Sequence, residues 1–257
     1  MYFYKSSQCF AAQLCVCGLL LFLDLCVDII GGHEVAPHSR PFMAMLRGED
    51  FCGGALIKPS WVLTAAHCTL EGGSVTLGAH SRTKREKEKQ VIKIAKEIRY
   101  PGYVRGEKEH DIMLLKLSKR AKINNAVQDI PLPTSGDDVK PGTTCRVAGW
   151  GRTTNRNEKL SDTLREVNVT VISRKTCNDK KHYKNSITNN MICAGSKGRK
   201  KGSCNGDSGG PLICNNVVKG ITSFGKPLCG FPDGPGVYTR ITNQYLQWIR
   251  KTIGGDL

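Results

Sequence analysis

Short apolar segments separated by turn residues run along the chain beyond residue 28, and this pattern limits the fold more than any other feature. Examples are residues 55–57, 146–151, 164–172 and 217–222. Many short strands at such spacing are typical of antiparallel barrels and sandwiches. The 28 glycines among 257 residues fit a turn-rich globular protein. We therefore predict an all-β fold.

One helix is expected, at the C-terminal end. In the range 243–253, apolar residues recur at helical spacing, and Asn243 is of a type that caps helices. Further upstream, the polar stretch 137–142 is a candidate connection between two halves of the fold.

The first residues have the pattern of a secretory signal. Lys5 precedes an unbroken apolar run at residues 14–23, which is too short for a membrane-spanning helix. The alternative is an uncleaved membrane anchor, but no basic stop-transfer cluster follows the run. We expect a signal peptide at residues 1–26, secretion, and no stable membrane insertion.

The cysteines favour disulfides. Four of the 12 cysteines lie in the leader, which leaves eight beyond it. An even number in a secreted chain indicates disulfides. A zinc site would need close Cys-x-x-Cys or His-x-x-x-His pairs, which the sequence beyond the leader lacks. We expect neither a metal nor a cofactor.

The chain is strongly basic, with a formal net charge of +16. Its basic residues gather in four clusters, at residues 82–89, 119–122, 180–184 and 197–201. Such clusters with few nearby acids suggest an anionic partner. No helix-turn-helix, zinc-finger or aromatic RNA-binding signature occurs, so we expect no nucleic acid. In a secreted protein, an acidic proteoglycan or another sulfated glycan fits the charge better.

Three short segments carry the residues of nucleophilic catalysis. They are Leu63 to Cys68 with His67, Asp111 to Leu115 with Asp111, and Gly206 to Pro211 with Ser208. A serine hydroxyl is a poor nucleophile until a base takes its proton, and neutral histidine can do so near pH 7. A carboxylate fixes the imidazole tautomer and stabilises the cation that forms. By itself the glycine-flanked serine could belong to a linker or a tight turn, but the three segments together predict a Ser-His-Asp hydrolase.

With Ile29-Ile30-Gly31-Gly32 and Gly236-Val237-Tyr238 in the same order, these segments resemble the chymotrypsin-like serine proteases of the trypsin family. The resemblance implies two six-stranded antiparallel β-barrels, a C-terminal helix and an active site between the barrels. It implies a serine endopeptidase that acts on proteins and peptides, with the protease domain at 29–257 and its two barrels divided near 123–142.

The same resemblance assigns further roles. His67, Asp111 and Ser208 would form the triad, and the backbone N–H groups of Gly206 and Ser208 would form the oxyanion hole. The family's disulfides would be Cys52–Cys68, Cys145–Cys214, Cys177–Cys193 and Cys204–Cys229.

Activation is implied as well. In this family the new amino terminus pairs with the aspartate before the serine, here Ile29 with Asp207. Digestive and clotting zymogens carry Arg or Lys before that terminus, whereas this chain has Val27-Asp28. If the signal ends at Cys26, residues 27–28 form an activation dipeptide that a dipeptidyl peptidase can remove.

Within the family, the chain resembles the branch that contains granzyme A and granzyme K. The segments that carry this resemblance are 37–41, 136–142, 161–167 and 222–225. It implies a cytotoxic-lymphocyte enzyme stored in secretory granules on acidic proteoglycan, with a role in cytolysis and with serpin-type inhibitors. Relatives that form a disulfide-linked dimer carry a cysteine where this chain has Gly102, so we expect no covalent homodimer.

The chain departs from that branch in the specificity pocket, which the resemblance places at Gly202, Ser203, Ser223, Gly225 and Gly236. Tryptic members hold an aspartate six residues before the serine, where this chain has Gly202. Aspartate-cleaving relatives carry an arginine in place of Gly236. The pocket is therefore expected to be uncharged and to accept large apolar or aromatic side chains, because a buried Lys or Arg would lack its counter-charge.

Other interpretations stay open from the sequence. A tryptase that cleaves after Lys or Arg despite Gly202 is favoured by family analogy. A mast-cell chymase-like protease would share the dipeptide and the basic charge. A non-catalytic glycan-binding homologue would use only the basic surface. Finally, Asn168-Val169-Thr170 is a glycosylation sequon in an expected strand, so its use depends on whether that face is exposed.

Overall fold

The structure is a computed structural model that describes residues 29–196, 201–231 and 234–254. The expected signal peptide, the dipeptide 27–28 and most of the basic cluster 197–201 lie outside the described residues. The elements in chain order are β1 (His33–Glu34), β2 (Met43–Arg47), β3 (Phe51–Lys58), β4 (Trp61–Thr64), β5 (Ser74–Leu77), β6 (Gln90–Arg99), β7 (Met113–Leu117), β8 (Thr144–Gly149), β9 (Arg165–Ile172), α1 (Arg174–Cys177), β10 (Met191–Gly195), β11 (Pro211–Cys214), β12 (Val217–Phe224), β13 (Gly236–Arg240) and α2 (Asn243–Ile253).

Six strands close the first barrel, in the order β2-β3-β4-β7-β6-β5. All neighbours are antiparallel, and short turns such as Pro59-Ser60 between β3 and β4 connect several of them. The register brings Leu46, Val75 and Ile92 side by side on three adjacent strands, and all three are buried. Alternating apolar residues thus fill the barrel interior.

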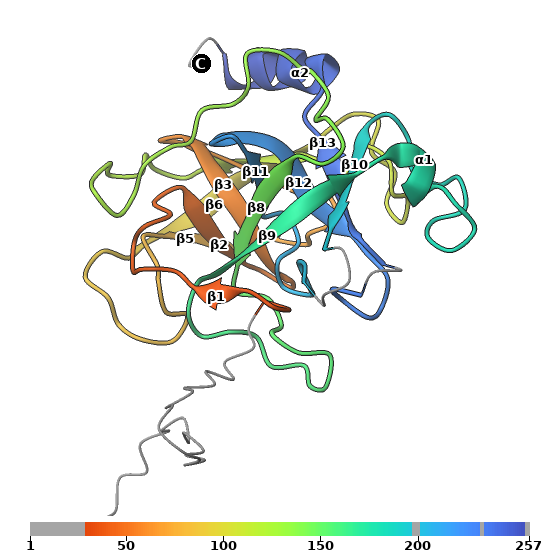
Figure 1. Cartoon of the computed structure of the whole chain (residues 1–257). Coiled ribbons are helices and arrows are strands. Elements are labelled where there is room, and N and C mark those ends of the chain that lie inside the picture. The colour runs from red at the N-terminus through yellow and green to blue at the C-terminus, as the bar shows by residue number, and fades with distance from the viewer. Residues whose placement is uncertain (1–28, 197–200, 232–233, 255–257) are drawn as a thin grey trace, which may run out of the picture.

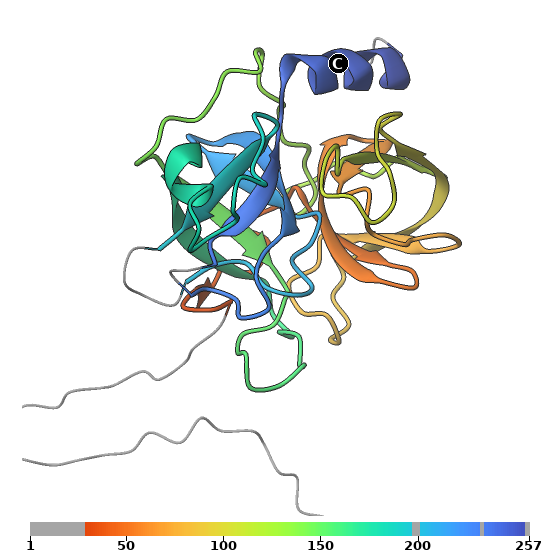
Figure 2. The ribbon, with the colours of Figure 1, turned by 90° about the vertical axis from the view of Figure 1, so that its right-hand side faces the viewer.

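The second barrel has the order β8-β9-β10-β13-β12-β11, and β11 returns to β8. The short strand β1 adds to its β9 edge. Figures 1 and 2 show the two barrels side by side, with α2 lying across one end of the molecule. The two closed barrels and the terminal helix confirm the predicted fold class. The connection between β7 and β8 spans residues 118–143 and adds no strand to either barrel.

Helix α2 covers the predicted range, Asn243–Ile253, but its N-cap is Thr242 rather than Asn243. The Thr242 side chain accepts a hydrogen bond from the Tyr245 N–H group. Asn243 Oδ1 accepts instead from the Gly136 N–H group at 2.7 Å and so ties the helix to the connection between the barrels. The sequence-based cap was therefore wrong by one residue, because Asn243 is engaged in a long-range contact.

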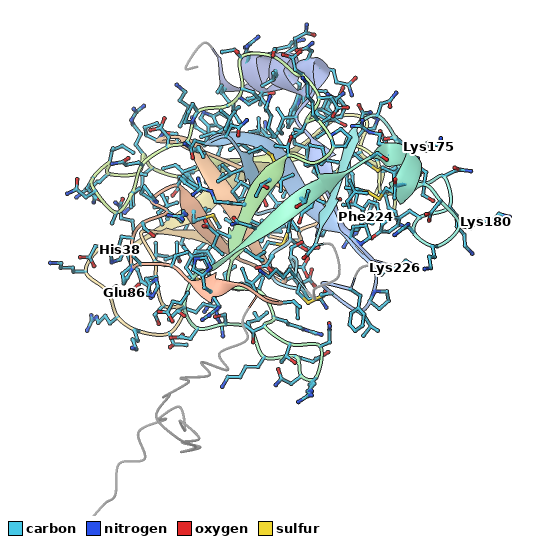
Figure 3. All side chains as sticks on the ribbon, viewed as in Figure 1. His38, Glu86, Lys175, Lys180, Phe224 and Lys226 are labelled. Atoms are coloured by element: carbon cyan, nitrogen blue, oxygen red, sulfur yellow. A yellow bond between two sulfur atoms is a disulfide. The ribbon has the colours of Figure 1, made fainter. Side chains whose placement is uncertain are left out.

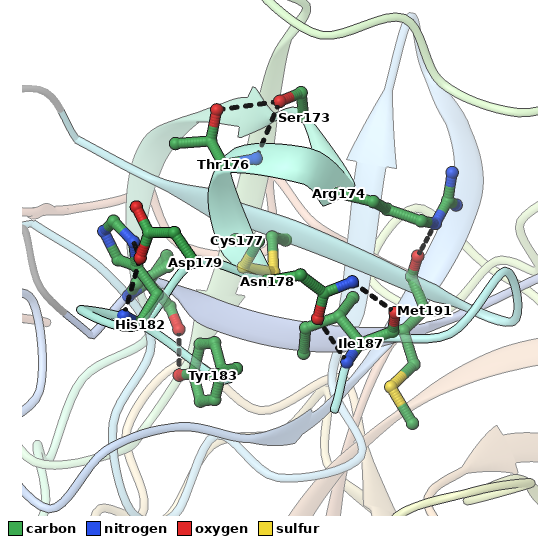
Figure 4. The surroundings of a disulfide bond; sticks show 12 residues. Ser173, Arg174, Thr176, Cys177, Asn178, Asp179, His182, Tyr183, Ile187 and Met191 are labelled. Carbon is green, nitrogen blue, oxygen red and sulfur yellow. Dashed lines mark hydrogen bonds and ion pairs between the residues drawn. A yellow bond between two sulfur atoms is a disulfide. The ribbon is translucent and has the colours of Figure 1, made fainter. Parts of the chain in front are cut away.

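Four disulfides brace the fold, and they join the pairs that the family resemblance implies. Figure 4 shows Cys177–Cys193, which links α1 to β10. Helix α1 has only four residues, too few for a periodic pattern, and Ser173 caps it. None of the helices in the described ranges is long and apolar enough to cross a membrane.

Candidate active site

His67 and Asp111 are brought together by two neighbouring strands of the first barrel. Strand β4 ends at Thr64, and its partner β7 begins at Met113, which pairs with Thr64. His67, which follows β4, and Asp111, which precedes β7, therefore lie at the same end of this strand pair. His67 Nδ1 lies 2.7 Å from Asp111 Oδ2, and the His67 backbone N–H group donates to Asp111 Oδ1 at 2.9 Å.

The second barrel completes the surroundings of Asp111. Ser223 Oγ donates to Asp111 Oδ2 at 2.5 Å, and Thr239 Oγ1 donates to the Asp111 carbonyl oxygen at 2.9 Å. The Asp111 residue is only 3% exposed. Burial by itself raises the pKa of a carboxylate, but the bonds and charge of His67 and the Ser223 hydroxyl outweigh it and lower the pKa of Asp111. Asp111 is thus held as a carboxylate at the seam between the barrels.

The same contact changes the histidine. Burial disfavours the charged imidazolium, but the hydrogen bond and charge of Asp111 outweigh that effect and raise the pKa of His67. His67 remains partly exposed, with 35% of its side-chain surface accessible. It can therefore exchange a proton with a group that binds beside it.

Ser208 lies in the turn between β10 and β11, against the segment that leads to His67. Its carbonyl oxygen accepts from the Gly53 N–H group at 2.7 Å, and Gly53 follows Cys52 of the Cys52–Cys68 disulfide. The next residue, Gly209, has a φ of +80°, and a side chain there would collide with the Thr64 hydroxyl and the Gly53 carbonyl oxygen. A glycine is required for this close approach. The sequence-predicted nucleophile and base thus lie on facing segments of the two barrels.

The residue before Ser208, Asp207, has a buried carboxylate. Gly206 has a φ of +95°, a backbone conformation that favours glycine. Asp207 is fully buried and accepts from the N–H groups of Gly151 at 2.7 Å and Cys204 at 2.9 Å. Burial raises the pKa of Asp207 to about 6, despite these two donors.

The expected activation residue lies close to these segments. Ile29 is fully buried among residues of the second barrel. The carbonyl oxygen of Ile30 accepts from the Gly202 N–H group at 3.1 Å. The start of the described chain is therefore bonded to the segment that leads to Asp207 and Ser208.

The glycines of the expected pocket differ in the space that surrounds each of them. A Cβ atom at Gly202 would make only an ordinary contact, 3.5 Å from Gly230 Cα, and one at Gly225 would meet nothing within 4 Å. At Gly236, by contrast, it would lie 2.9 Å from the Tyr238 hydroxyl and 3.1 Å from Ser203 Oγ. Gly202 can thus carry a larger side chain, whereas Gly236 cannot without disturbing its neighbours.

Several contributions were not visible in the sequence. The Ser223 side chain, expected only in the pocket, bonds to Asp111. The fully buried Tyr238 shares a hydrogen bond of 3.1 Å with Ser203. Lys108 lies 4.8 Å above the ring of Phe224, next to Ser223 in β12. Each of these contacts joins residues at least 35 positions apart, so no local motif could reveal them.

Two other features adjoin His67. The two sulfurs of the Cys52–Cys68 disulfide and a ring nitrogen of His67 lie within 4.8 Å of one another. Sulfurs in a disulfide are not thiolate ligands, so this cluster does not fit a metal. A groove of about 600 Å³ runs from His67 between the segment 66–72 and strand β6, and Arg99 and Arg105 line it.

Comparisons with known proteins agree with this geometry. The model of the trypsin family, described as "Trypsin", matches residues 29–249. Bovine granzyme A is 51% identical over 248 residues, covering 94% of this chain and 95% of the relative. Murine granzyme B(G,H) is 45% identical, covering 91% and 98%. Among solved structures, mouse neuropsin, a serine protease expressed in the limbic system, superposes with a TM-score of 0.79 at 40% identity, covering 86% and 98%.

Proposed function

The chain belongs to the trypsin family of serine endopeptidases, and we propose that His67, Asp111 and Ser208 form its catalytic triad. The observation that carries this proposal is the contact of 2.7 Å between His67 Nδ1 and the buried carboxylate of Asp111. That contact leaves Nε2 of His67 as the nitrogen that can accept a proton.

The proposed reaction is acyl transfer. Ser208 Oγ bonds to the carbonyl carbon of the scissile peptide while its proton moves to Nε2 of His67. The carbonyl oxygen becomes an oxyanion, which the N–H groups of Gly206 and Ser208 stabilise, by about 3 kcal/mol for each donor. The imidazolium then gives its proton to the leaving amine, and the peptide C–N bond breaks. Water hydrolyses the acyl-enzyme by the same proton route and restores Ser208.

Labelling with a fluorophosphonate probe tests this assignment. We expect the enzyme that begins at Ile29 to be labelled and to hydrolyse protein substrates, and we expect Ser208→Ala to lose both activities. A non-catalytic homologue would leave the wild-type chain unlabelled, which would refute the proposal.

We also propose that release of Ile29 activates the enzyme. While residue 28 is attached, the Ile29 nitrogen is an uncharged amide, and the fully buried carboxylate of Asp207 forms no ion pair with a cation among the described residues. An ammonium group at Ile29 would supply that charge and would order the turn of Gly206 and Ser208. Activity should therefore differ sharply between chains beginning at Val27 and at Ile29; equal activity of the two purified forms would contradict this mechanism.

For substrate preference, we propose cleavage after large apolar or aromatic residues. The room beside the buried Gly202 supports a slot for a side chain, and Gly202 brings no charge to it. Burying a large apolar side chain there would contribute about 1.5–3 kcal/mol, whereas Lys or Arg would be buried unpaired. The alternative is the tryptase that family analogy suggests.

A peptide library cleaved by wild type and Gly202→Asp distinguishes the two. Because a side chain at position 202 meets only an ordinary contact, the variant is expected to fold. Wild type should cleave after Phe, Tyr, Leu or Met, and Gly202→Asp should gain cleavage after Lys and Arg. Wild-type cleavage after Lys or Arg would overturn the uncharged-pocket proposal.

A basic strip on the first barrel supports the proposed glycan partner. In β6 a bulge at Ala95 interrupts the alternation of side chains, so that Lys96 pairs with Lys116 of β7. Neighbouring residues of a strand point to opposite faces, so Lys116 points away from the face of Leu117, and Lys93 points away from the face of Ile94, which pairs with Leu117. Lys93 and Lys96 therefore both lie on the outer face of the barrel. Ser118 donates its N–H group to the Lys93 carbonyl oxygen and brings Lys119 alongside. We call Lys93, Lys96, Lys116 and Lys119 the β6–β7 strip.

In the described ranges, no lysine of the β6–β7 strip forms an ion pair with an acidic residue. Lys96 and Lys116 lie directly opposite each other, and like charges in that position repel. A linear sulfated glycan would relieve this repulsion by lying along the strands. Lys175 in α1 and Lys180 just after it form a second group of basic residues, which Figure 3 labels. We propose that the β6–β7 strip is the main site because its charges are cross-strand neighbours.

Elution from immobilised heparin tests this site. Lys93→Ser/Lys96→Ser should elute at lower salt than wild type, and the matched pair Lys175→Ser/Lys180→Ser should elute later than this variant, because both remove two charges. Hydrolysis of a short peptide should stay unchanged in all three. Equal losses in both variants would mean that net charge alone, not the strip, binds the glycan.

Storage in secretory granules on such a glycan, secretion and serpin inhibition remain part of the proposal, supported by the granzyme relatives and the basic surface. Asn168 itself is exposed in β9, which supports glycosylation at the sequon. Digestion with an N-glycosidase should increase gel mobility of the secreted chain, and Asn168→Gln should abolish that shift.

A further inference from the structure

The backbone next to Asp111 is held in an unfavourable conformation. His110 has a φ of +57°, in the left-handed region that a histidine seldom occupies. Its carbonyl oxygen accepts from the Ile112 N–H group at 2.7 Å, so the chain makes a tight turn with Asp111 at its centre. A turn of this kind persists only where the surrounding structure holds it.

The C-terminal helix α2 stabilises this turn. The hydroxyl of Tyr245 in α2 shares a hydrogen bond of 2.8 Å with His110 Nδ1, across 135 positions of sequence. Tyr245 is fully buried. The ring of Tyr100 stacks on His110 at 5.2 Å and packs edge-on against Tyr245 at 4.9 Å.

Gly102 lies against another part of the His110 ring. A Cβ atom at Gly102 would lie 3.2 Å from His110 Cδ2 and from the Tyr100 ring. The partly exposed imidazole thus contacts Gly102, Tyr100 and Tyr245, and its hydrogen bond with the Tyr245 hydroxyl fixes its orientation. A rotation of the ring would break its hydrogen bond with Tyr245 and its stacking on Tyr100.

We propose that His110 and Tyr245 are positioning residues, which hold the turn that aims the Asp111 carboxylate at His67. Ser223 and Thr239 hold Asp111 from the second barrel, whereas the His110–Tyr245 pair holds it from α2. The terminal helix therefore contributes to catalytic geometry and not only to the core. The inference rests on the proposed role of Asp111.

Tyr245→Phe is the sharpest test, because it removes one oxygen and keeps the packed ring. We expect kcat to fall about fivefold to tenfold, because without this hydrogen bond the Asp111 carboxylate is held less precisely, with KM changed by less than about twofold. Active-site titration with the fluorophosphonate probe counts only folded enzyme. Thr252→Ala, which removes the hydrogen bond from Thr252 Oγ1 to the Trp248 carbonyl in the same helix, is the matched control and should retain wild-type kcat.

A second readout separates positioning from mere stability. Asp111, and more distantly Asp50, raises the pKa of His67. If the Asp111 carboxylate is positioned less precisely, it raises the pKa of His67 by less. The acid limb of the kcat/KM profile should therefore move to lower pH in Tyr245→Phe. If Tyr245→Phe fails to fold, His110→Asn is the second variant, because asparagine tolerates the left-handed backbone but lacks the ring. The acid limb of its kcat/KM profile should move in the same direction.

The outcomes are distinguishable. An unlabelled, inactive wild type would refute the proposed function itself. An active wild type with Tyr245→Phe and His110→Asn variants that keep kcat and the pH profile unchanged would overturn only the positioning role.

Discussion

At the scale of single residues, the two oxygens of Asp111 have separate tasks. Oδ1 accepts from the His67 backbone, and Oδ2 accepts from both His67 Nδ1 and Ser223. These three donors come from both barrels, His67 from the first and Ser223 from the second. The carboxylate thus fixes both the position of the His67 loop and the tautomer of its ring.

An asparagine at position 111 should retain the shape of the site but not its chemistry. We expect Asp111→Asn to lower kcat by about 10⁴-fold near neutral pH, because the amide favours the wrong tautomer and no longer stabilises the imidazolium. Steady-state hydrolysis, normalised by circular dichroism to folded protein, measures the effect. A loss below tenfold would indicate that Asp111 is not the triad carboxylate.

Asp207 gives a prediction on pH. Its folded pKa of about 6 lies above the ordinary value of 3.8, so the folded precursor binds a proton more tightly than the unfolded chain. The precursor should therefore lose stability as pH rises from about 4 to about 6, by about 3 kcal/mol in all. Urea unfolding at pH 4.5 and 7 measures this loss.

Asp207→Asn in the precursor serves as the control, since it should remove most of that pH dependence. In the form that begins at Ile29, the new ammonium group should lower the pKa of Asp207 and abolish the loss. A precursor as stable at pH 7 as at pH 4.5 would show that Asp207 is not buried without a partner.

At the scale of elements, two disulfides of equal sequence separation have different surroundings. Cys52–Cys68 and Cys177–Cys193 each span 16 positions. The first ties β3 to the residue after His67, whereas the second ties α1 to β10, away from the triad. The entropy of the unfolded chain should change equally when either is removed.

Replacing each pair by serines should separate stability from function. We expect both double variants to lose about 3 kcal/mol of unfolding free energy. Only Cys52→Ser/Cys68→Ser should also lose kcat per titrated active site, because the His67 loop is no longer tied to β3. Equal kcat in the two variants would mean that the strands alone position His67.

At the scale of the whole molecule, the structure bears on assembly. The eight cysteines beyond the leader are all consumed in the four disulfides within the chain. Gly102 lies against the rings of His110 and Tyr100.

We therefore predict that the mature protein forms no disulfide-linked dimer. It should migrate as a monomer on a non-reducing gel, with or without dithiothreitol. A dimer that dithiothreitol splits would contradict this prediction, and Gly102→Cys provides a positive control for the cross-link.

The sequence by itself determined the all-β class, the range of the terminal helix and the segments that carry the proposed triad. These features depend on short-range periodicity and on motifs whose residues are neighbours in the chain. The specific barrel pairing and the disulfide partners followed from the family resemblance, because composition and spacing leave several arrangements open.

Only the tertiary structure decided how those segments are held. The Thr242 cap, the Ser223 bond to Asp111, the bulge that aligns Lys93 with Lys96 and the hold of Tyr245 on His110 all depend on which distant residues meet. Local preference is weak compared with a buried hydrogen bond or a packed ring, so long-range packing decides such contacts. For that reason the chemistry of this chain is visible in its motifs, while the precision of the site depends on its fold.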